Sequence, residues 1–255
     1  MRLLKDGSLA ALTAGFVAVL VGFTSSAVIV FQAARTLQAG TAEIASWMLS
    51  LGLGMGLTSI GLSLRFRVPV LTAWSTPGAA MLITGAAGVS LPEATGAFLV
   101  CAALITVSGF SGWFERMIGH IPISIASGML AGVLLRFGLD AFGAMASQFV
   151  LVFPMFCAYL LCRRLLPRYA IVVTLLLGVG IAAAQDQLRL DGVQLELAVP
   201  VFIAPQFSWT ALVGVALPLF VVTMASQNVP GVAVIRASGY RVPISPLIGW
   251  TGAAN

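Results

Sequence analysis

The sequence predicts an all-α polytopic membrane protein, and three observations support that prediction. Hydrophobic residues make up 60% of the 255 residues and charged residues only 8%. A soluble domain normally carries about 25% charged residues, so this chain could not cover a water-facing surface. The hydrophobic residues fall into runs of about 20 residues, the length that crosses the hydrocarbon core as a helix. The basic residues lie mainly between these runs.

Eight apolar segments and the start of a ninth follow one another along the chain. Polar or proline-containing separators such as 163–168 and 185–196 divide them. The first segment is too long for the hydrophobic region of a signal peptide, so we expect it to remain as a span. The predicted spans are residues 8–33, 44–64, 68–88, 94–114, 121–138, 142–162, 170–185 and 208–233, with a ninth starting near Pro246.

Charge counting predicts the orientation of these spans. Short cytoplasmic loops carry an excess of Lys and Arg. If the N-terminus is cytoplasmic and the spans alternate, ten of the 13 Lys and Arg residues fall inside and three outside. This alternation requires residues 68–88 to cross the membrane. Because the basic residues form no patch, the net charge of +5 does not indicate a nucleic-acid partner.

The third span is interrupted by the residues AWSTPGAAM at 73–81. Residues 68–74 are rich in β-branched and aromatic side chains and could be extended. A short helix would follow, with Ser75 or Thr76 as its N-cap and Pro77 in its first turn. Such a half-helix would direct its N–H groups and positive dipole end toward the middle of the bilayer, where they attract anions. The alternative is a proline kink in a continuous helix.

Other polar residues inside the spans are candidates for a binding site, because such residues are costly in hydrocarbon. Ser25 and Ser26 lie near the middle of the first span, although serine in a membrane helix often bonds back to its own helix. Gln227 and Asn228 lie in the eighth span, and we expect Pro230 to break the helix just after them. Trp74 adjoins the interruption and could stack on a planar ligand.

Residue patterns typical of enzymes are missing from the sequence. It contains no Ser/His/Asp arrangement, no His/Cys metal set and no paired carboxylates inside the predicted spans. The three cysteines show neither metal-ligand spacing nor a disulfide framework, so we expect them to be packing residues. The sequence therefore predicts a protein that is not an enzyme and has no metal site or cofactor.

Four long stretches of the sequence are distinctive: GFTSSAVIVFQAA (22–34), AWSTPGAAML (73–82), MLAGVLLRFGLDAF (129–142) and PLFVVTMASQNVPGVAVIRASGY (218–240). They resemble the benzoate/proton symporter family of bacterial inner membranes. The resemblance extends over the whole chain, and the family is similar to nucleobase and sulfate permeases. It implies proton-coupled uptake of benzoate or a related aromatic carboxylate in a lipid bilayer, with the proton as coupling ion and a homodimer as a possible assembly.

The resemblance also implies an architecture of two inverted repeats of seven segments, with broken half-helices in the third and tenth. Residues 1–118 would form part of a core domain, 119–200 part of a gate domain, and 201–255 the start of the second repeat. Because the chain stops inside the ninth segment, we expect it to be a fragment of a longer protein. The substrate-binding residues predicted from the resemblance and the interruption are Ser25, Ser26, Trp74, Ser75, Thr76, Gly78, Gln227 and Asn228.

Three alternatives to benzoate symport remain at this point. A permease of the same fold could carry another planar or anionic solute, such as a nucleobase or sulfate. The chain could form a passive channel, or a truncated membrane protein that transports nothing. In addition, nucleobase permeases carry an acidic residue in the eighth segment, where this chain has ASQN at 225–228. Amides do not take up protons, so we expect the proton-coupling group to lie elsewhere.

Overall fold

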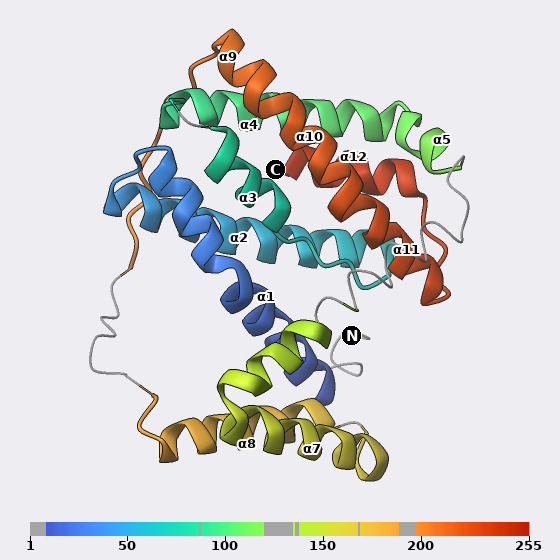
Figure 1. The fold of residues 1–255 in the computed structure, drawn as a ribbon. Coiled ribbons are helices and arrows are strands. Elements are labelled where there is room, and N and C mark those ends of the chain that lie inside the picture. The colour runs from blue at the N-terminus through green and yellow to red at the C-terminus, as the bar shows by residue number, and fades with distance from the viewer. Residues whose placement is uncertain are drawn as a thin grey trace. The chain divides into compact units, whose positions relative to one another are not determined.

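The computed structural model describes residues 9–86, 88–119, 135, 138–167, 169–188 and 197–254. Every regular element within these residues is a helix (Figure 1). Contacts divide the chain into two compact units. The smaller unit comprises Met1–Ser25 and Gly132–Glu196, and the larger unit comprises Ser26–Ala131 and Leu197–Asn255. Helix α1, Leu9–Thr36, contributes residues to both. The predicted core and gate assignment remains a prediction.

The larger unit holds the elements around the predicted site. Two π-helical turns, η1 (Leu212–Ala216) and η2 (Met224–Asn228), join three short α-helices into one helical segment from Trp209 to Ala237. We call this segment the composite helix. The α-helices of the larger unit are α2 Thr41–Phe66, α3 Thr76–Gly85, α4 Leu91–Phe110, α5 Trp113–Gly119, α9 Trp209–Ala211, α10 Leu217–Thr223, α11 Val229–Ala237 and α12 Ile244–Ala254.

The smaller unit contains α7, Phe149–Leu165, packed against α8, Ala170–Ala184 (Figure 1). The contact is close at Gly178, where a Cβ atom would lie 2.7 Å from the Met155 sulfur. The predicted span 142–162 is not one helix. Residues 138–147 form a separate helix, and Gln148, at φ −134° and ψ 57°, separates it from α7.

A side-chain hydrogen bond lies directly before the interruption at Gln148. The Ser147 hydroxyl donates to the Ala144 carbonyl at 3.1 Å, and serine bonds of this kind compete with the backbone ladder of a helix. Hydropathy alone does not detect such an interruption, because the flanking residues are apolar. The predicted span 121–138 lies mostly outside the described residues.

One face of the short helix α3 packs into the core of the larger unit. Ala79 and Leu82 of α3 are buried together with Val30 and Ala33 from the C-terminal half of α1. Small residues from α4 and from the composite helix complete the cluster, so the helices approach closely around α3. Figure 1 shows α3 as a short helix among longer ones. The further members include Ala94, Ala97, Ala211, Val215 and Ala216.

Helices α4 and α12 pack through glycines. A Cβ atom at Gly109 would lie 2.2 Å from the Gly249 nitrogen, and one at Gly252 would lie 2.5 Å from the Thr106 nitrogen. Small residues allow membrane helices to pack backbone against backbone, where van der Waals contact replaces the hydrophobic driving force. Larger side chains at these glycines would therefore separate α4 from α12.

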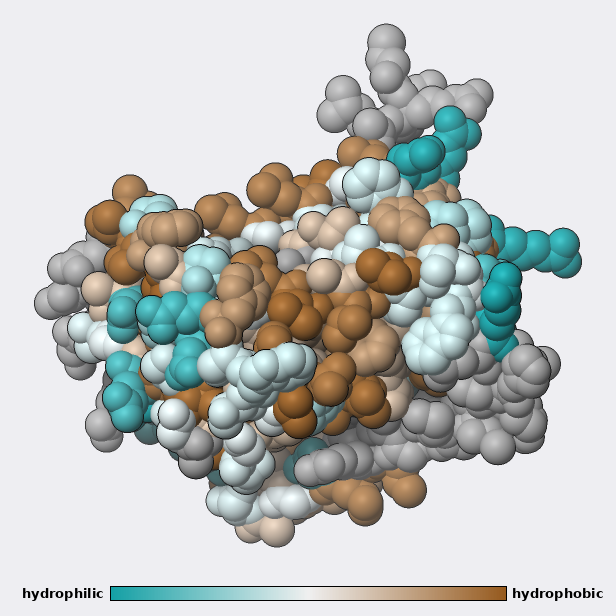
Figure 2. Space-filling model, turned by 90° about the horizontal axis from the view of Figure 1, so that it is seen from above, coloured by the Kyte–Doolittle hydropathy of each residue, from teal (hydrophilic) through white to brown (hydrophobic). Residues whose placement is uncertain are grey.

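Three helical segments of the described residues are long and apolar enough to cross a membrane: Thr41–Phe66, Leu91–Phe110 and Trp209–Ala237. Within α2 only Ser46 and Leu62 are buried, and Leu57 is 69% exposed. Hydrophobic side chains also cover the middle of the face in Figure 2. A continuous apolar surface of this kind needs a nonpolar environment. The prediction of an all-α membrane protein is confirmed, while the inverted repeat remains a prediction.

Candidate functional site

Residues 68–75, just before α3, are not helical and run beside α2. The backbone N–H of Val70 donates to the Ser63 hydroxyl at 3.0 Å, and that hydroxyl donates to the Val70 carbonyl at 3.1 Å. Two residues later, the N–H of Thr72 donates to the Ser59 hydroxyl at 3.0 Å. Backbone groups that a helix would pair internally therefore find partners on α2. We call Ser59 and Ser63, with their neighbour Thr58, the hydroxyl ladder.

The spacing of the ladder follows from helix and strand geometry. Two residues of extended chain advance about 6.6 Å, and four residues of α-helix advance about 6.0 Å along one face. Val70 and Thr72 therefore meet Ser63 and Ser59 in antiparallel order. The Thr72 hydroxyl extends the contact, because it donates to the Met55 carbonyl at 3.1 Å and shares a hydrogen bond with Thr58. Irregular backbone among membrane helices requires partners of this kind.

Helix α3 begins as the sequence predicts. Ser75 is the N-cap, with φ −83° and ψ 101°, and its hydroxyl accepts the N–H of Gly78 at 3.1 Å. Pro77 lies in the first turn, where its missing N–H costs nothing. The alternative of a kink in a continuous helix is wrong, since the residues before Ser75 are extended. The ten residues of α3 measure about 15 Å, roughly half of the ~30 Å hydrocarbon core.

The cap leaves some donors of the first turn unused. Within the described residues, the N–H groups of Ser75 and Thr76 have no hydrogen-bond partner, because the first intrahelical bond runs from Ala79 to the Ser75 carbonyl. These two N–H groups lie at the positive end of the α3 dipole, where a carboxylate is stabilised.

Gly78 lies where α3 meets the composite helix. It is buried, and a Cβ atom there would lie 2.7 Å from Cδ1 of Leu219 and 3.0 Å from the Ser75 hydroxyl. The absence of a side chain at Gly78 therefore allows α10 to approach the first turn of α3. The predicted site residue thus contacts another helix in this structure.

Ser26 and Trp74 are brought together by a hydrogen bond between α1 and the extended segment. The Trp74 indole Nε1 donates to the Ser26 hydroxyl at 2.8 Å, and Ser26 is only 5% exposed. This bond fixes the indole beside the N-cap of α3. Ser25 belongs to α1, but its side chain lies outside the described residues.

Gln227 and Asn228 lie in η2, half-buried. The Asn228 amide donates to the Met224 sulfur at 2.9 Å. Within the described part of the chain, neither amide hydrogen-bonds to α3 or to the extended segment. Leu219 is the residue of the composite helix that contacts α3 at Gly78, and the two amides lie eight and nine residues beyond it. They are therefore about 12–14 Å further along the composite helix than this contact. The predicted residues therefore form two separate groups, one around the start of α3 and one in η2.

The expected break at Pro230 is wrong. The chain stays helical through this proline, and the π turn η2 ends two residues before it. The π turn η1 stands in the same relation to Pro218. Proline removes the N–H that the carbonyl four residues earlier would accept, and a wider turn redistributes the remaining bonds. Such π turns are frequent at functional sites.

A second extended segment resembles the first. Residues 197–208 precede α9, and the N–H of Val201 donates to the Ser46 hydroxyl of α2 at 2.8 Å. Ser208 caps α9 by accepting the N–H of Ala211 at 3.2 Å. Ser46 and the hydroxyl ladder were not predicted from the sequence. A detectable signal was the four-residue spacing of Ser59 and Ser63 next to a segment predicted to be extended.

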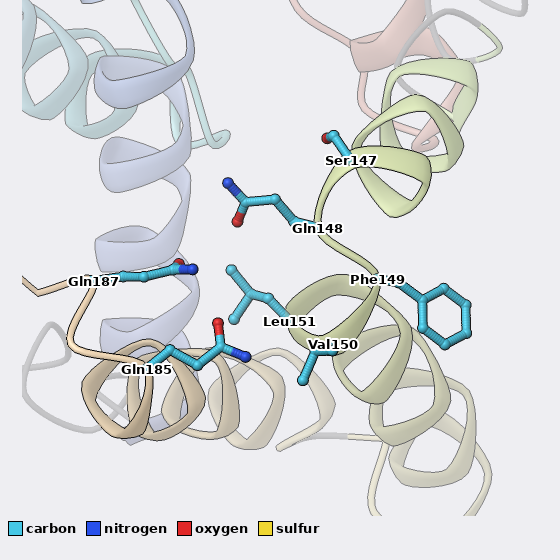
Figure 3. Close-up of a pocket in the computed structure, with 7 residues that line it drawn as sticks. All are labelled: Ser147, Gln148, Phe149, Val150, Leu151, Gln185 and Gln187. Atoms are coloured by element: carbon cyan, nitrogen blue, oxygen red, sulfur yellow. The ribbon is translucent and has the colours of Figure 1, made fainter.

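Two hollows formed by described residues lie apart from these groups. One, in the smaller unit, has a volume of about 300 Å³, and three glutamines face it while Phe149 points away (Figure 3). The other, in the larger unit, has a volume of about 200 Å³ and is lined by Glu115, Arg236, Tyr240 and Arg241, among others. The described residues contain no group of His, Cys, Asp and Glu that could hold a metal ion.

Comparison with known proteins identifies relatives of the whole chain. Residues 5–255 match the family described as benzoate membrane transport protein, BenE. The chain is 50% identical to the inner membrane protein YdcO of Escherichia coli K12, over 94% of this chain and 62% of that protein. It is 39% identical to the benzoate membrane transport protein of Acinetobacter baylyi, over 98% of this chain and 64% of that protein.

The chain therefore spans less than two thirds of the length of these relatives. No solved structure matches it. The family match covers nearly every residue, including the interrupted third segment and the π turns of the composite helix. The chain belongs to the BenE family of membrane transport proteins.

Proposed function

We propose that the full-length protein is a proton-coupled importer of benzoate or a related aromatic carboxylate in a bacterial inner membrane. The observation that carries this proposal is the start of α3, which combines a positioned indole with two N–H groups that have no partner among the described residues. Family membership supports it, since one relative is named a benzoate membrane transport protein and another an inner membrane protein. The cytoplasmic N-terminus and a homodimer belong to the same proposal.

The carboxylate would bind at the first turn of α3. The N–H groups of Ser75 and Thr76 supply hydrogen bonds, and the helix dipole adds a favourable field. The Ser75 hydroxyl already accepts the Gly78 N–H, yet a hydroxyl also has one proton to donate. Gly78 allows Leu219 of α10 to pack on this turn. These groups match a small anion and supply no charged side chain of their own.

The aromatic ring would lie against Trp74. Because the indole N–H donates to Ser26, the ring plane is held in one orientation. Offset or edge contacts between aromatic rings contribute about 0.5–1.5 kcal/mol beyond burial. Ser26 on α1 completes this side of the site, and Ser25 remains a predicted binding residue.

Gln227 and Asn228, about 12–14 Å further along the composite helix, would form a second part of the proposed site. Their amides can donate to a carboxylate and are neutral at every physiological pH. The π turn that carries them gives this part of the composite helix a backbone that can rearrange, which suits alternating access. The group that takes up the coupling proton is not one of these amides.

Uptake by proteoliposomes tests the proposal. Vesicles with the full-length protein should accumulate labelled benzoate when an inward proton gradient is imposed. Uptake that does not depend on the proton gradient would exclude proton coupling. Flux that neither saturates nor concentrates benzoate would indicate a channel. Competition by uracil or sulfate, but not by substituted benzoates, would indicate another solute. No uptake and no ligand-dependent stabilisation would indicate a protein that does not transport.

Asn228→Leu tests the assignment of the site. It should abolish uptake while the protein still inserts into the membrane, because an amide donor is lost without a change in charge. Gln187→Leu removes an exposed amide from the smaller unit and should leave uptake unchanged. Equal uptake by the two variants would contradict the assignment of Asn228.

A further inference from the structure

The hollow beside Arg236 and Arg241 is formed where two membrane-length segments end. Leu91–Phe110 is followed at once by α5, and the composite helix ends at Ala237. The two ends lie together, since Glu115 of α5 and Arg236 of α11 line the same hollow. Helices of this length leave the hydrocarbon near their ends, so the hollow lies at the level of the membrane interface.

The chain reverses sharply beside this hollow. The N–H of Tyr240 donates to the Ile235 carbonyl at 3.1 Å, and the N–H of Gly239 donates to the Arg236 carbonyl at 3.0 Å. Gly239 has φ +81°, so these bonds form a Schellman motif, in which glycine is the favoured residue. The turn positions Arg236, at the end of α11, and Arg241, after the turn, on the wall of one hollow.

The floor of the hollow is rigid. Ile244 at the start of α12 is buried in a cluster with Phe114 and Val232. The Ser245 hydroxyl donates to the Glu115 carboxylate at 2.6 Å, which ties α12 to α5. The hollow is therefore built by three elements that pack on one another, and its two arginines are exposed above a fixed base.

The charges around the hollow suit a single anion. Among the described residues, two arginines and one glutamate line it, so these lining charges sum to +1. The Glu115 carboxylate is engaged by Ser245, while arginine side chains suit the oxygens of a phosphate group. Tyr240 is half exposed beside them, and tyrosine is common at the membrane interface. One phosphodiester carries the complementary charge of −1.

From these observations we propose that the hollow binds the headgroup phosphate of an anionic phospholipid such as phosphatidylglycerol. Arg236 and Arg241 hold the phosphate oxygens, and the acyl chains lie along the exposed apolar surface of the composite helix. Basic pockets between membrane helices are known to bind anionic lipid headgroups. The lipid connects α5, α11 and α12 at the ends of their spans, and the proposal is independent of the transported substrate.

Lipid retention measured by native mass spectrometry tests the proposal on the full-length protein. Arg236→Gln/Arg241→Gln should lower the affinity for phosphatidylglycerol at least tenfold and leave phosphatidylcholine binding unchanged. Arg163→Gln/Arg164→Gln is the matched control, because it removes two exposed charges from the last turn of α7. The control should bind phosphatidylglycerol like the unaltered protein. Equal losses in the two double variants would overturn the proposal.

Two further measurements keep the test decisive. Inorganic phosphate at the same concentration should displace little phosphatidylglycerol, and full displacement would show a site for a soluble anion instead. If the double variant does not fold, Arg241→Gln alone serves, because this residue lies in the exposed turn after α11. The single variant should lower the affinity several-fold, and an unchanged affinity would overturn the proposal.

Discussion

Prolines occur in two regions of the larger unit with different consequences. At Pro77 the helix starts anew after an extended segment, whereas at Pro218 and Pro230 the chain remains helical and widens into a π turn. The difference lies in the neighbours. Val70 and Thr72 find hydroxyl partners on α2. In η2, Ser226 instead donates to the Val222 carbonyl of its own helix.

The comparison shows that proline alone does not decide between a broken and a continuous membrane helix. A break leaves several backbone groups without intrahelical partners, and each such group is costly in hydrocarbon. Where a neighbouring helix supplies hydroxyls, the extended form is stable. Where no neighbouring helix supplies hydroxyls, a π turn allows most backbone groups to find partners within their own helical segment. The predictions below follow from this comparison, in decreasing order of their expected effect on stability.

Ser59→Ala/Ser63→Ala removes the two serines of the hydroxyl ladder, which accept the N–H groups of Val70 and Thr72, and should have the largest effect. Leaving a buried backbone group without a partner costs about 1–3 kcal/mol, and two N–H groups are affected. Thermal unfolding in nanodiscs should show a lower midpoint, and residues 68–75 should exchange amide hydrogens faster. Ser50→Ala is the control, since its hydroxyl bonds only within α2. A double variant as stable as this control would show that the ladder does not hold the extended segment.

Gly78→Ala should destabilise the contact between α3 and the composite helix. The new methyl group would meet Leu219, and overpacking of this kind costs about 1–3 kcal/mol. Gly85→Ala places the same methyl group at the other end of α3, where nothing lies within 4 Å. Unfolding curves should separate the two variants, and Leu219→Ala should partly restore the first. Similar curves for both glycine variants would contradict the close packing at Gly78.

Ser75→Ala and Ser75→Asp separate capping from anion binding. Loss of the N-cap should cost about 1 kcal/mol, whereas aspartate caps as well as serine. Ser75→Asp should therefore unfold like the unaltered protein, yet its negative charge should repel a carboxylate and abolish benzoate uptake. Normal uptake by a stable Ser75→Asp variant would show that the anion does not bind at the start of α3.

Pro230→Ala and Pro218→Ala compare the two π turns and should have the smallest effects on stability. Each restores a backbone N–H where the chain is already helical, so unfolding should be unchanged or slightly delayed. Only Pro230→Ala should alter the uptake of benzoate, because η2 carries Gln227 and Asn228. Equal effects of the two variants on uptake would show that η2 has no greater role in benzoate uptake than η1.

Much of the local structure could be predicted from the sequence. The Ser-Thr-Pro-Gly order at 75–78 contains both the cap and the favoured proline position, so the start of α3 depends on four neighbouring residues. The membrane-length helices could also be predicted, because the hydropathy of a segment depends only on the residues within it. The interruption at Gln148 was missed because apolar residues flank it and no proline or glycine marks it.

The sequence by itself determined the class of the protein, the helix start at Ser75 and the residues that belong to one family. Each of these depends on composition or on residues within about one turn of one another. Only the tertiary structure decided that Ser59 and Ser63 stabilise an extended segment and that Leu219 packs on Gly78. It also decided that Pro230 widens the helix without breaking it. These outcomes depend on which hydroxyl or side chain a distant helix presents, because a backbone group in an apolar environment takes whatever partner lies within reach.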